Sequence, residues 1–293
     1  MNRALVTCLI SGEYTLYDLN SKETLLAKPR GVFRNKQTTV KVGDYVEYER
    51  GNPFSTITKV EKRTNDLVRP QIANVDQAII VTSVKEPELN LNLLDRFIAI
   101  MEFNNIEPIL VFNKMDLLTE DEKTKYNVVF NYYKSIGYHT LLTSTKETEL
   151  IEALKPFIKD KISVITGQSG VGKSSILNVI DSSFNLQTNE ISKALNRGKH
   201  TTRYTSFYPF EDGWIVDTPG FGLIDLQDMS TTDLSHSFVE FFELSNECKY
   251  NGCLHLNEPN CKIKKAISEK SILNSRYENY LQMINEINSK RKW

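Results

Sequence analysis

The sequence has no long hydrophobic run, few cysteines and almost no net charge. No stretch of the 293 residues approaches the roughly 18 consecutive apolar residues of a membrane-spanning helix. Residues 1–5 are not followed by a long apolar leader segment or a cleavage-like site. We therefore expect a cytoplasmic protein that does not associate with membranes. The formal net charge of −1 excludes a globally basic chain, so any binding of nucleic acid must use local patches.

Only four cysteines are present, and three of them are clustered. Cys8 stands alone, whereas Cys248, Cys253 and Cys261 lie close to His255 in the sequence. In a reducing compartment, such clustering favours metal binding over disulfide formation. Three thiolates and one imidazole make a closed tetrahedral set, which is typical of a structural zinc site. We expect one zinc ion per chain, and the alternative is a group of reduced cysteines that are near one another by chance.

Short strands are predicted for the first part of the chain. Residues 1–68 contain about five apolar or alternating runs without a long helical period, at 4–10, 14–17, 23–26, 42–48 and 55–60. This pattern predicts a small β-barrel such as an OB-fold, which commonly binds oligonucleotides. The tract 28–36 places positive charges around Phe33, which suits phosphate contact and base stacking. An ordinary solvated loop would have the same composition.

Strands and helices then alternate up to about residue 226. Strands are predicted at 78–81, 109–112, 140–143 and 162–165, and helices at 91–103, 119–136 and 150–158. This alternation is typical of a doubly wound α/β domain. Residues 227–293 are predicted to be helical on both sides of the cysteine cluster. Four apolar residues are expected to lie on one face of the first of these helices: Leu234, Phe238, Phe241 and Phe242.

The segment 167–174 matches the phosphate-binding motif G-x-x-x-x-G-K-S. It lies between a predicted strand and a predicted helix, which is the context that the motif requires. Backbone N–H groups would surround an anion, Lys173 would reach the β- and γ-phosphates, and Ser174 would bind Mg²⁺. A glycine-rich turn that matches by chance is the alternative. The expected nucleotide contacts are Gly167, Gln168, Ser169, Gly170, Val171, Gly172, Lys173, Ser174 and Ser175.

Asn113-Lys114-Met115-Asp116 follows a predicted strand and matches the N-K-x-D guanine motif of GTPases. The Asp116 carboxylate can accept two hydrogen bonds from guanine that adenine cannot donate, so the motif predicts GTP over ATP. Asn113 and Lys114 would support the base. Thr143 and Ser144, at the end of the next strand, match the shorter base-contacting motif of GTPases.

Asp217-Thr218-Pro219-Gly220 matches the D-x-x-G motif of GTPases. Asp217 would hold Mg²⁺ through water, and the N–H of Gly220 would contact the γ-phosphate. Either Thr201 or Thr202, in the segment 198–203, would close over Mg²⁺. The guanine motif precedes the phosphate loop, so the chain is a circular permutation of an ordinary GTPase. The predicted fold is multidomain: an N-terminal OB-fold β-barrel (1–68), a central circularly permuted α/β P-loop GTPase domain (69–226) and a C-terminal α-helical zinc-binding domain (227–293).

The motif order, the sequence GKHTT at 198–202 and the Cys-Cys-His-Cys spacing resemble the bacterial family of ribosome small-subunit-dependent GTPases, RsgA. The resemblance covers essentially the whole chain. It implies a GTP hydrolase that binds the 30S subunit and its 16S rRNA and acts in late assembly, with nucleotide state controlling rRNA binding. The family usually has arginine where this chain has Lys199, so only a basic role is carried over there. We expect a monomer.

Phe221 occupies the position at which many GTPases carry the glutamine that orients the attacking water. A phenyl ring cannot hydrogen-bond to water, so His200 becomes the candidate for this catalytic role, together with Lys173, Thr201 and Thr202. A surface position or an RNA contact is the alternative for His200. The missing glutamine also leaves open a second function, a GTP-gated RNA-binding adaptor in which hydrolysis is incidental. Both functions imply Mg²⁺ bound with GTP and one structural zinc.

Overall fold

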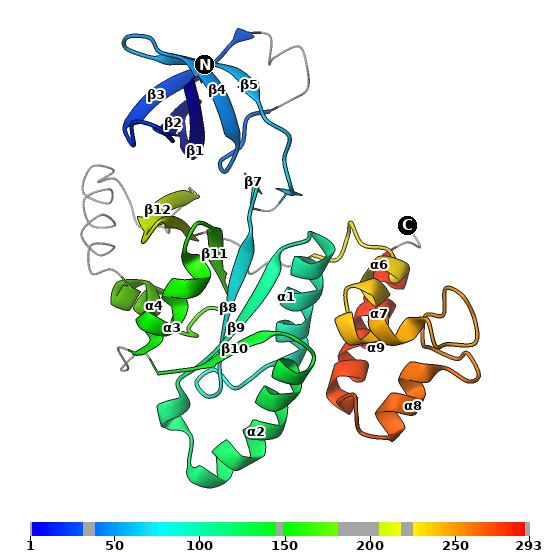
Figure 1. The fold of residues 1–293 in the computed structure, drawn as a ribbon. Coiled ribbons are helices and arrows are strands. Elements are labelled where there is room, and N and C mark those ends of the chain that lie inside the picture. Colours follow the sequence, from blue (N-terminus) through cyan, green and yellow to red (C-terminus); the bar gives the residue numbers. More distant parts are fainter. Residues whose placement is uncertain are drawn as a thin grey trace. The chain divides into compact units, whose positions relative to one another are not determined.

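The structure is a computed structural model that describes residues 2–31, 39–68, 70–144, 149–180, 205–217 and 225–290 (Figure 1). The chain divides into two compact units. The first comprises Met1–Gln77, Ile151–Thr166 and Leu177–Phe221, and the second Ala78–Leu150, Gly167–Ile176 and Gly222–Trp293. Among the described helices, none is both long and apolar enough to cross a membrane.

The first unit begins with a closed β-barrel of strand order β1-β2-β3-β5-β4. Its strands are β1 (Asn2–Ile10), β2 (Glu13–Asp18), β3 (Thr24–Pro29), β4 (Tyr45–Glu49) and β5 (Ser55–Val60). The strand pairs are antiparallel except for β3 and β5, which are parallel. Alternate residues such as Val6, Leu16 and Ile57 fill the barrel interior. The predicted barrel is confirmed, although β4 begins at Tyr45 rather than at residue 42, because Gly43 has a φ of +90° and cannot continue a strand.

A short pair of strands, β6 (Asp66–Leu67) and β7 (Ile72–Ala73), follows the barrel and precedes the central sheet. The sheet has the strand order β10-β9-β8-β11-β13-β12. Its strands are β8 (Gln77–Ser83), β9 (Glu107–Asn113), β10 (His139–Leu142), β11 (Ile162–Thr166), β12 (Ser206–Phe210) and β13 (Gly213–Asp217). Parallel pairs join β9 to β10 and β11 to β13, while β12 is antiparallel to β13. Strands β8, β9 and β11 are almost entirely buried, as their continuous apolar runs predicted.

The helices of this α/β region are α1 (Leu91–Phe103), α2 (Glu120–Ser135), α3 (Glu149–Ile158) and α4 (Lys173–Ile180). Local sequence fixes where two of them begin. The Asn90 side chain accepts a hydrogen bond from the N–H of Leu93 at the start of α1. Thr119 and Glu122 form a capping box at the start of α2. The predicted α/β alternation is therefore confirmed.

The C-terminal helices are α6 (Thr231–His236), α7 (Val239–Ser245), α8 (Lys262–Ser268) and α9 (Asn274–Lys290), which appear from yellow to red in Figure 1. Their core includes Leu234, Phe238 and Phe241, and it also contains Ala99 from α1. The prediction that Phe242 lies on the same helix face as these three residues is wrong, since its side chain is 53% exposed while theirs are buried. The chain is extended at Phe238, so α6 and α7 are separate helices and the apolar face does not continue to Phe242.

Candidate nucleotide site and metal centre

The phosphate loop lies between β11 and α4, and its shape depends on glycine. Gly167 has a φ of +139°, and a Cβ there would lie 2.0 Å from the carbonyl oxygen of Val81. Any side chain would therefore collide with the backbone of β8. Lys173 Nζ donates hydrogen bonds to the carbonyl oxygens of Gly167 and Gln168, both at 2.7 Å. The ammonium group is thus held at the loop where phosphates would bind.

The guanine motif is connected directly to this loop. Asn113 at the end of β9 is fully buried, and its Nδ2 donates to the carbonyl oxygen of Val171 at 2.8 Å. Lys114 has a φ of +64°, and its Nζ donates to the carbonyl oxygen of Gly170 at 2.9 Å and also to that of Glu86. The guanine motif and the phosphate loop are far apart in the sequence, and hydrogen bonds join them within the second unit.

The residues predicted to contact the base lie at the carboxyl ends of two neighbouring parallel strands. The N–H of Met115 donates to the carbonyl oxygen of Thr143 at 3.1 Å, which joins the guanine motif to the end of β10. Asp116 is exposed within the short helix η2 (Met115–Leu117), and Ser144 is buried. The Oδ1 of Asn113 is buried and accepts no hydrogen bond from the described part of the chain. Ligands of α/β sheets bind at such carboxyl edges.

Asp217 lies at the end of β13, where it is the register partner of Ile165 in β11. Asp217 therefore lies at the carboxyl end of the parallel pair β11–β13. The remaining predicted residues of this site, namely His200, Thr201, Thr202 and Gly220, lie outside the described residues, as do Lys199 and Phe221. Their roles stay predictions.

The second candidate site is the cluster of Cys248, Cys253, His255 and Cys261, whose ligand atoms all lie within 4.8 Å of one another. The Nδ1 atom of His255 is 3.8 Å from the Sγ of Cys248 and 3.4 Å from the Sγ of Cys261. Metal–sulfur and metal–nitrogen bonds of about 2.3 and 2.0 Å place tetrahedral nitrogen and sulfur ligands about 3.5 Å apart. The residues therefore fit a tetrahedral metal ion, and Nδ1 is the imidazole atom that faces the sulfurs.

Burial changes the pKa values of this cluster. Burial raises the pKa of the Cys253 thiol to about 12 and also raises the pKa of Cys261. Burial lowers the pKa of His255, which keeps the imidazole neutral. The N–H of Lys262 donates to the Sγ of Cys248 at 3.3 Å. A bound cation would replace the thiol protons and stabilise the closely spaced thiolates.

Comparison with known proteins identifies the family. The family model described as "RsgA GTPase" matches residues 60–227, and "RsgA N-terminal domain" matches residues 5–54. The chain belongs to the RsgA GTPase family. It is 42% identical to "Small ribosomal subunit biogenesis GTPase RsgA 2" of Oceanobacillus iheyensis over 96% of both chains. It is 43% identical to "Small ribosomal subunit biogenesis GTPase RsgA" of Pediococcus pentosaceus, over 99% of this chain and 94% of the relative.

Two solved structures of this family agree with the fold. YloQ, described as a circularly permuted GTPase, has a TM-score of 0.85 and 34% identity, covering 98% of this chain and 95% of its own. YjeQ from Thermotoga maritima has a TM-score of 0.86 and 37% identity, covering 98% of both chains. The RsgA-family chain is therefore a circularly permuted GTPase, and the predicted fold class and GTP hydrolase activity are confirmed.

The sequence did not predict the polar contacts that support the metal loop of this RsgA-family protein. The carboxylate of Glu258 accepts hydrogen bonds from the N–H groups of Leu254 and Leu256 at 2.8 and 2.7 Å. From α9, the Tyr277 hydroxyl donates to the carbonyl oxygen of His255 at 2.7 Å, and the Tyr280 hydroxyl donates to that of Leu254 at 2.8 Å. No sequence motif indicates that the hydroxyl groups of these two tyrosines hold the loop.

Proposed function

We propose that this GTPase couples GTP hydrolysis to binding and release of the small ribosomal subunit during its late assembly. The observation that carries the nucleotide part is the pair of hydrogen bonds from Asn113 and Lys114 to the phosphate loop. The small ribosomal subunit is proposed as the partner because relatives named small ribosomal subunit biogenesis GTPases match the chain over nearly its full length. The 30S subunit, through its 16S rRNA, is then the partner, with GTP and GDP as the nucleotides.

The proposed residue roles rest on the sequence motifs. Lys173 holds the β- and γ-phosphates, and Ser174 and Asp217 hold Mg²⁺, with Asp217 acting through water. Asp116 recognises guanine, supported by Asn113 and Lys114, while Thr143 and Ser144 contact the base. His200 orients the attacking water, Thr201 or Thr202 closes over Mg²⁺, and Gly220 contacts the γ-phosphate. Backbone and side-chain groups from Gly167 to Ser175 form the phosphate cradle.

Each of the three predicted regions has its own proposed role. Residues 69–226 hydrolyse GTP, and residues 227–293 are held by one zinc ion on Cys248, Cys253, His255 and Cys261. The barrel, residues 1–68, contacts rRNA. Lys28 supports the last role, because its Nζ lies 3.8 Å from the ring centroid of Phe54 while the side chain is 50% exposed. A cation stacked on an aromatic ring suits a surface for phosphates and bases. We propose a cytoplasmic monomer.

The experiment is multiple-turnover release of phosphate from GTP and from ATP, with and without 30S particles. We expect GTP to be preferred and 30S particles to raise kcat, while Lys173→Ala abolishes turnover. Co-sedimentation with 30S particles in GDP and in a non-hydrolysable GTP analogue tests the coupling, and the analogue should bind more tightly. Tighter binding in the analogue without any stimulation of hydrolysis would instead favour the GTP-gated adaptor.

A further inference from the structure

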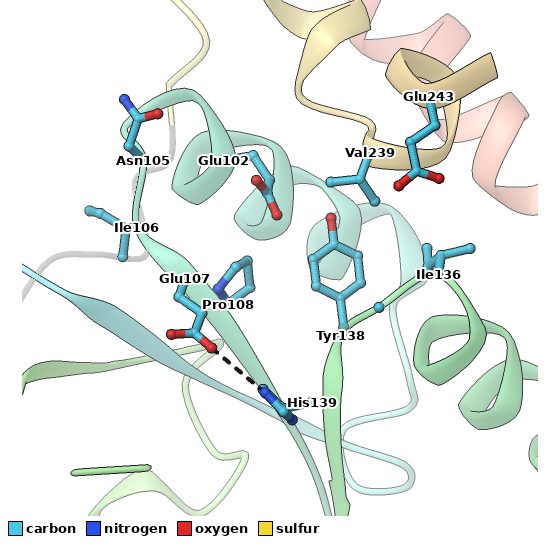
Figure 2. A pocket seen from close by; sticks show the side chains of 11 residues that line it. Glu102, Asn105, Ile106, Glu107, Pro108, Ile136, Tyr138, His139, Val239 and Glu243 are labelled. Atoms are coloured by element: carbon cyan, nitrogen blue, oxygen red, sulfur yellow. Dashed lines mark ion pairs between the residues drawn. The ribbon is translucent and has the colours of Figure 1, made fainter. Parts of the chain in front are cut away.

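An acidic pocket of about 440 Å³ lies in the second unit. None of its lining residues belongs to the nucleotide site or the metal centre. It forms where β9 and β10 begin, beside the ends of α1 and α2 and the start of α7 (Figure 2). The guanine motif lies at the opposite, carboxyl ends of the same two strands. The polar residues that line the pocket are Glu102, Asn105, Glu107, Tyr138, His139 and Glu243.

Tyr138 brings an unsatisfied polar atom into this pocket. The residue is 6% exposed, and its buried hydroxyl has no hydrogen-bond partner among the described residues. Figure 2 shows the hydroxyl directed toward the space between Glu102 and Val239. The phenol interacts with the carboxyl group of Glu102, although the two groups fall short of hydrogen-bond geometry. Burial raises the pKa of Glu102 more than this interaction lowers it. Buried polar groups are nearly always hydrogen-bonded, so this hydroxyl indicates a ligand.

The carboxylates of the pocket differ in whether they form an ion pair. Glu107 pairs with His139 at 3.7 Å, at one end of the pocket (Figure 2). Glu102 and Glu243 form no ion pair with any residue in the described part of the chain. Arg276 acts on Glu102 electrostatically, but its guanidinium group is already bonded to Asp95 and Glu240. Neither Glu102 nor Glu243 therefore has a cation of its own among the described residues.

A second hollow of about 420 Å³ continues from this pocket. It shares Glu102, Asn105, Val239 and Glu243 with the first and adds an apolar side formed by Phe103 and Phe242. Phe242 is 53% exposed, and its ring packs edge to face on His236 with the ring centroids 5.2 Å apart. The groove thus offers a site for a cation next to a site for an apolar side chain.

We propose that this groove binds an arginine side chain of a basic polypeptide partner, with a neighbouring apolar residue of that partner against Phe242. A guanidinium group has five donors in a planar fork and no acceptor. It can donate to the carboxylates of Glu102 and Glu243 and to the phenol oxygen of Tyr138, whose own O–H then donates to Glu102. The carboxylates would repel nucleic-acid phosphates, so the groove is a protein-binding surface separate from the GTPase activity.

The test is NMR titration of the isotope-labelled full-length chain with the peptide Ac-Ala-Arg-Leu-Ala-NH₂. We expect saturable shifts of the backbone amides of Glu102, Tyr138 and Glu243, weakening as salt rises. The matched peptide with glutamine in place of arginine should bind at least about tenfold more weakly, since it cannot pair with the carboxylates. Glu102→Gln, Glu243→Gln and Tyr138→Phe should each weaken the arginine peptide, whereas the exposed Asp121→Asn on α2 should not.

Three outcomes would overturn the proposal. The first is the absence of shifts at the groove with the unaltered protein, a result that does not depend on whether any variant folds. The second is equal binding of the arginine and glutamine peptides, which would show that the groove recognises only the apolar residue of the peptide. The third is saturable binding of a short oligouridine at the same amides. GTP turnover should be unchanged in Glu243→Gln, so failure of this proposal is distinguishable from failure of the proposed GTPase function.

Discussion

Arg276 on α9 and Asp95 on α1 form an ion pair in which both side chains are inaccessible to solvent. The Nη1 atom of Arg276 donates to Oδ1 of Asp95 at 2.6 Å, and the two side chains are 1% and 0% exposed. Arg276 Nε also donates to Glu240 on α7 at 2.8 Å. Asp95 accepts further hydrogen bonds from the hydroxyl of Tyr133 and the amide of Asn279, at 2.5 and 2.6 Å. A hydrogen-bonded ionic cluster therefore connects α1 and α2 of the α/β region to the C-terminal helices.

Removing the cation from this cluster should be costly. Burial raises the pKa of Asp95, and Arg276 opposes that rise. Arg276→Met would leave two buried carboxylates without a counter-charge, which costs about 3–5 kcal/mol. Arg96→Met is the matched control, because Arg96 pairs with Glu286 between the same two helices but is 18% exposed. That pair should contribute at most about 1 kcal/mol.

Hydrogen exchange of the α9 amides measures this difference. We expect exchange to accelerate by at least about a hundredfold in Arg276→Met and by less than about tenfold in Arg96→Met, in line with their energies. Equal protection of α9 in both variants would show that the buried pair does not hold the helix to α1.

The cluster also shows what the sequence could predict and what it could not. The phosphate loop, the guanine motif and the α/β alternation were predictable, because each is encoded within a short segment. Asp95 and Arg276 are 181 positions apart and both are charged, so their local sequence indicates only an exposed helix surface. The helix face on which Phe242 lies was predicted wrongly, because the break between α6 and α7 depends on one extended residue, Phe238. The acidic pocket depends on the packing of three helices and two strands and leaves no motif.

Asp116 should determine which base is bound. Asp116→Asn replaces an acceptor of two hydrogen bonds with an amide that cannot accept both, so affinity for GDP should fall at least about tenfold. Affinity for xanthosine diphosphate should rise, because its altered base edge suits an amide. Calorimetric titration with both nucleotides measures this, and the exposed Asp121→Asn serves as the control. An unchanged ratio of the two affinities would show that Asp116 does not recognise the base.

The metal centre should contain one zinc ion per chain, measured by elemental analysis of protein purified without chelator. Cys261→Ser should lose the metal, whereas Cys8→Ser, in strand β1 of the barrel, should retain it. Affinity should fall as the pH falls, because thiolates and a neutral imidazole are the ligands. Tyr277→Phe removes the hydrogen bond to the carbonyl oxygen of His255 and should speed metal loss to a chelator by about tenfold. Full metal retention in Cys261→Ser would exclude the proposed ligand set.

The barrel contains a carboxylate whose titration should control its acid stability. The hydroxyl of Tyr48 donates to Oδ2 of Asp18 at 2.5 Å, and the N–H groups of Asn20 and Ser21 donate to Oδ1 at 2.8 and 2.7 Å. These bonds, led by that of Tyr48, lower the pKa of Asp18 to about 2. The unfolded chain has the ordinary value near 4. Because the folded form binds the proton more weakly, the stabilisation is complete above about pH 4 and is lost as the pH falls through about 2.

Tyr48→Phe should therefore raise the pKa of Asp18 toward its ordinary value and remove part of the stability that the barrel has at neutral pH. The loss should be greatest above about pH 4 and should shrink as the pH falls through about 2, below which the carboxyl group is protonated in both proteins. Tyr14→Phe is the control, because the Tyr14 hydroxyl lies in the same barrel core but donates to the carbonyl oxygen of Val40. NMR titration of the Asp18 carboxyl group measures its pKa. Acid unfolding of the unaltered protein, Tyr48→Phe and Tyr14→Phe measures how their stability depends on pH. An Asp18 pKa that stays near 2 in Tyr48→Phe would assign the shift to the backbone N–H groups and not to the phenol.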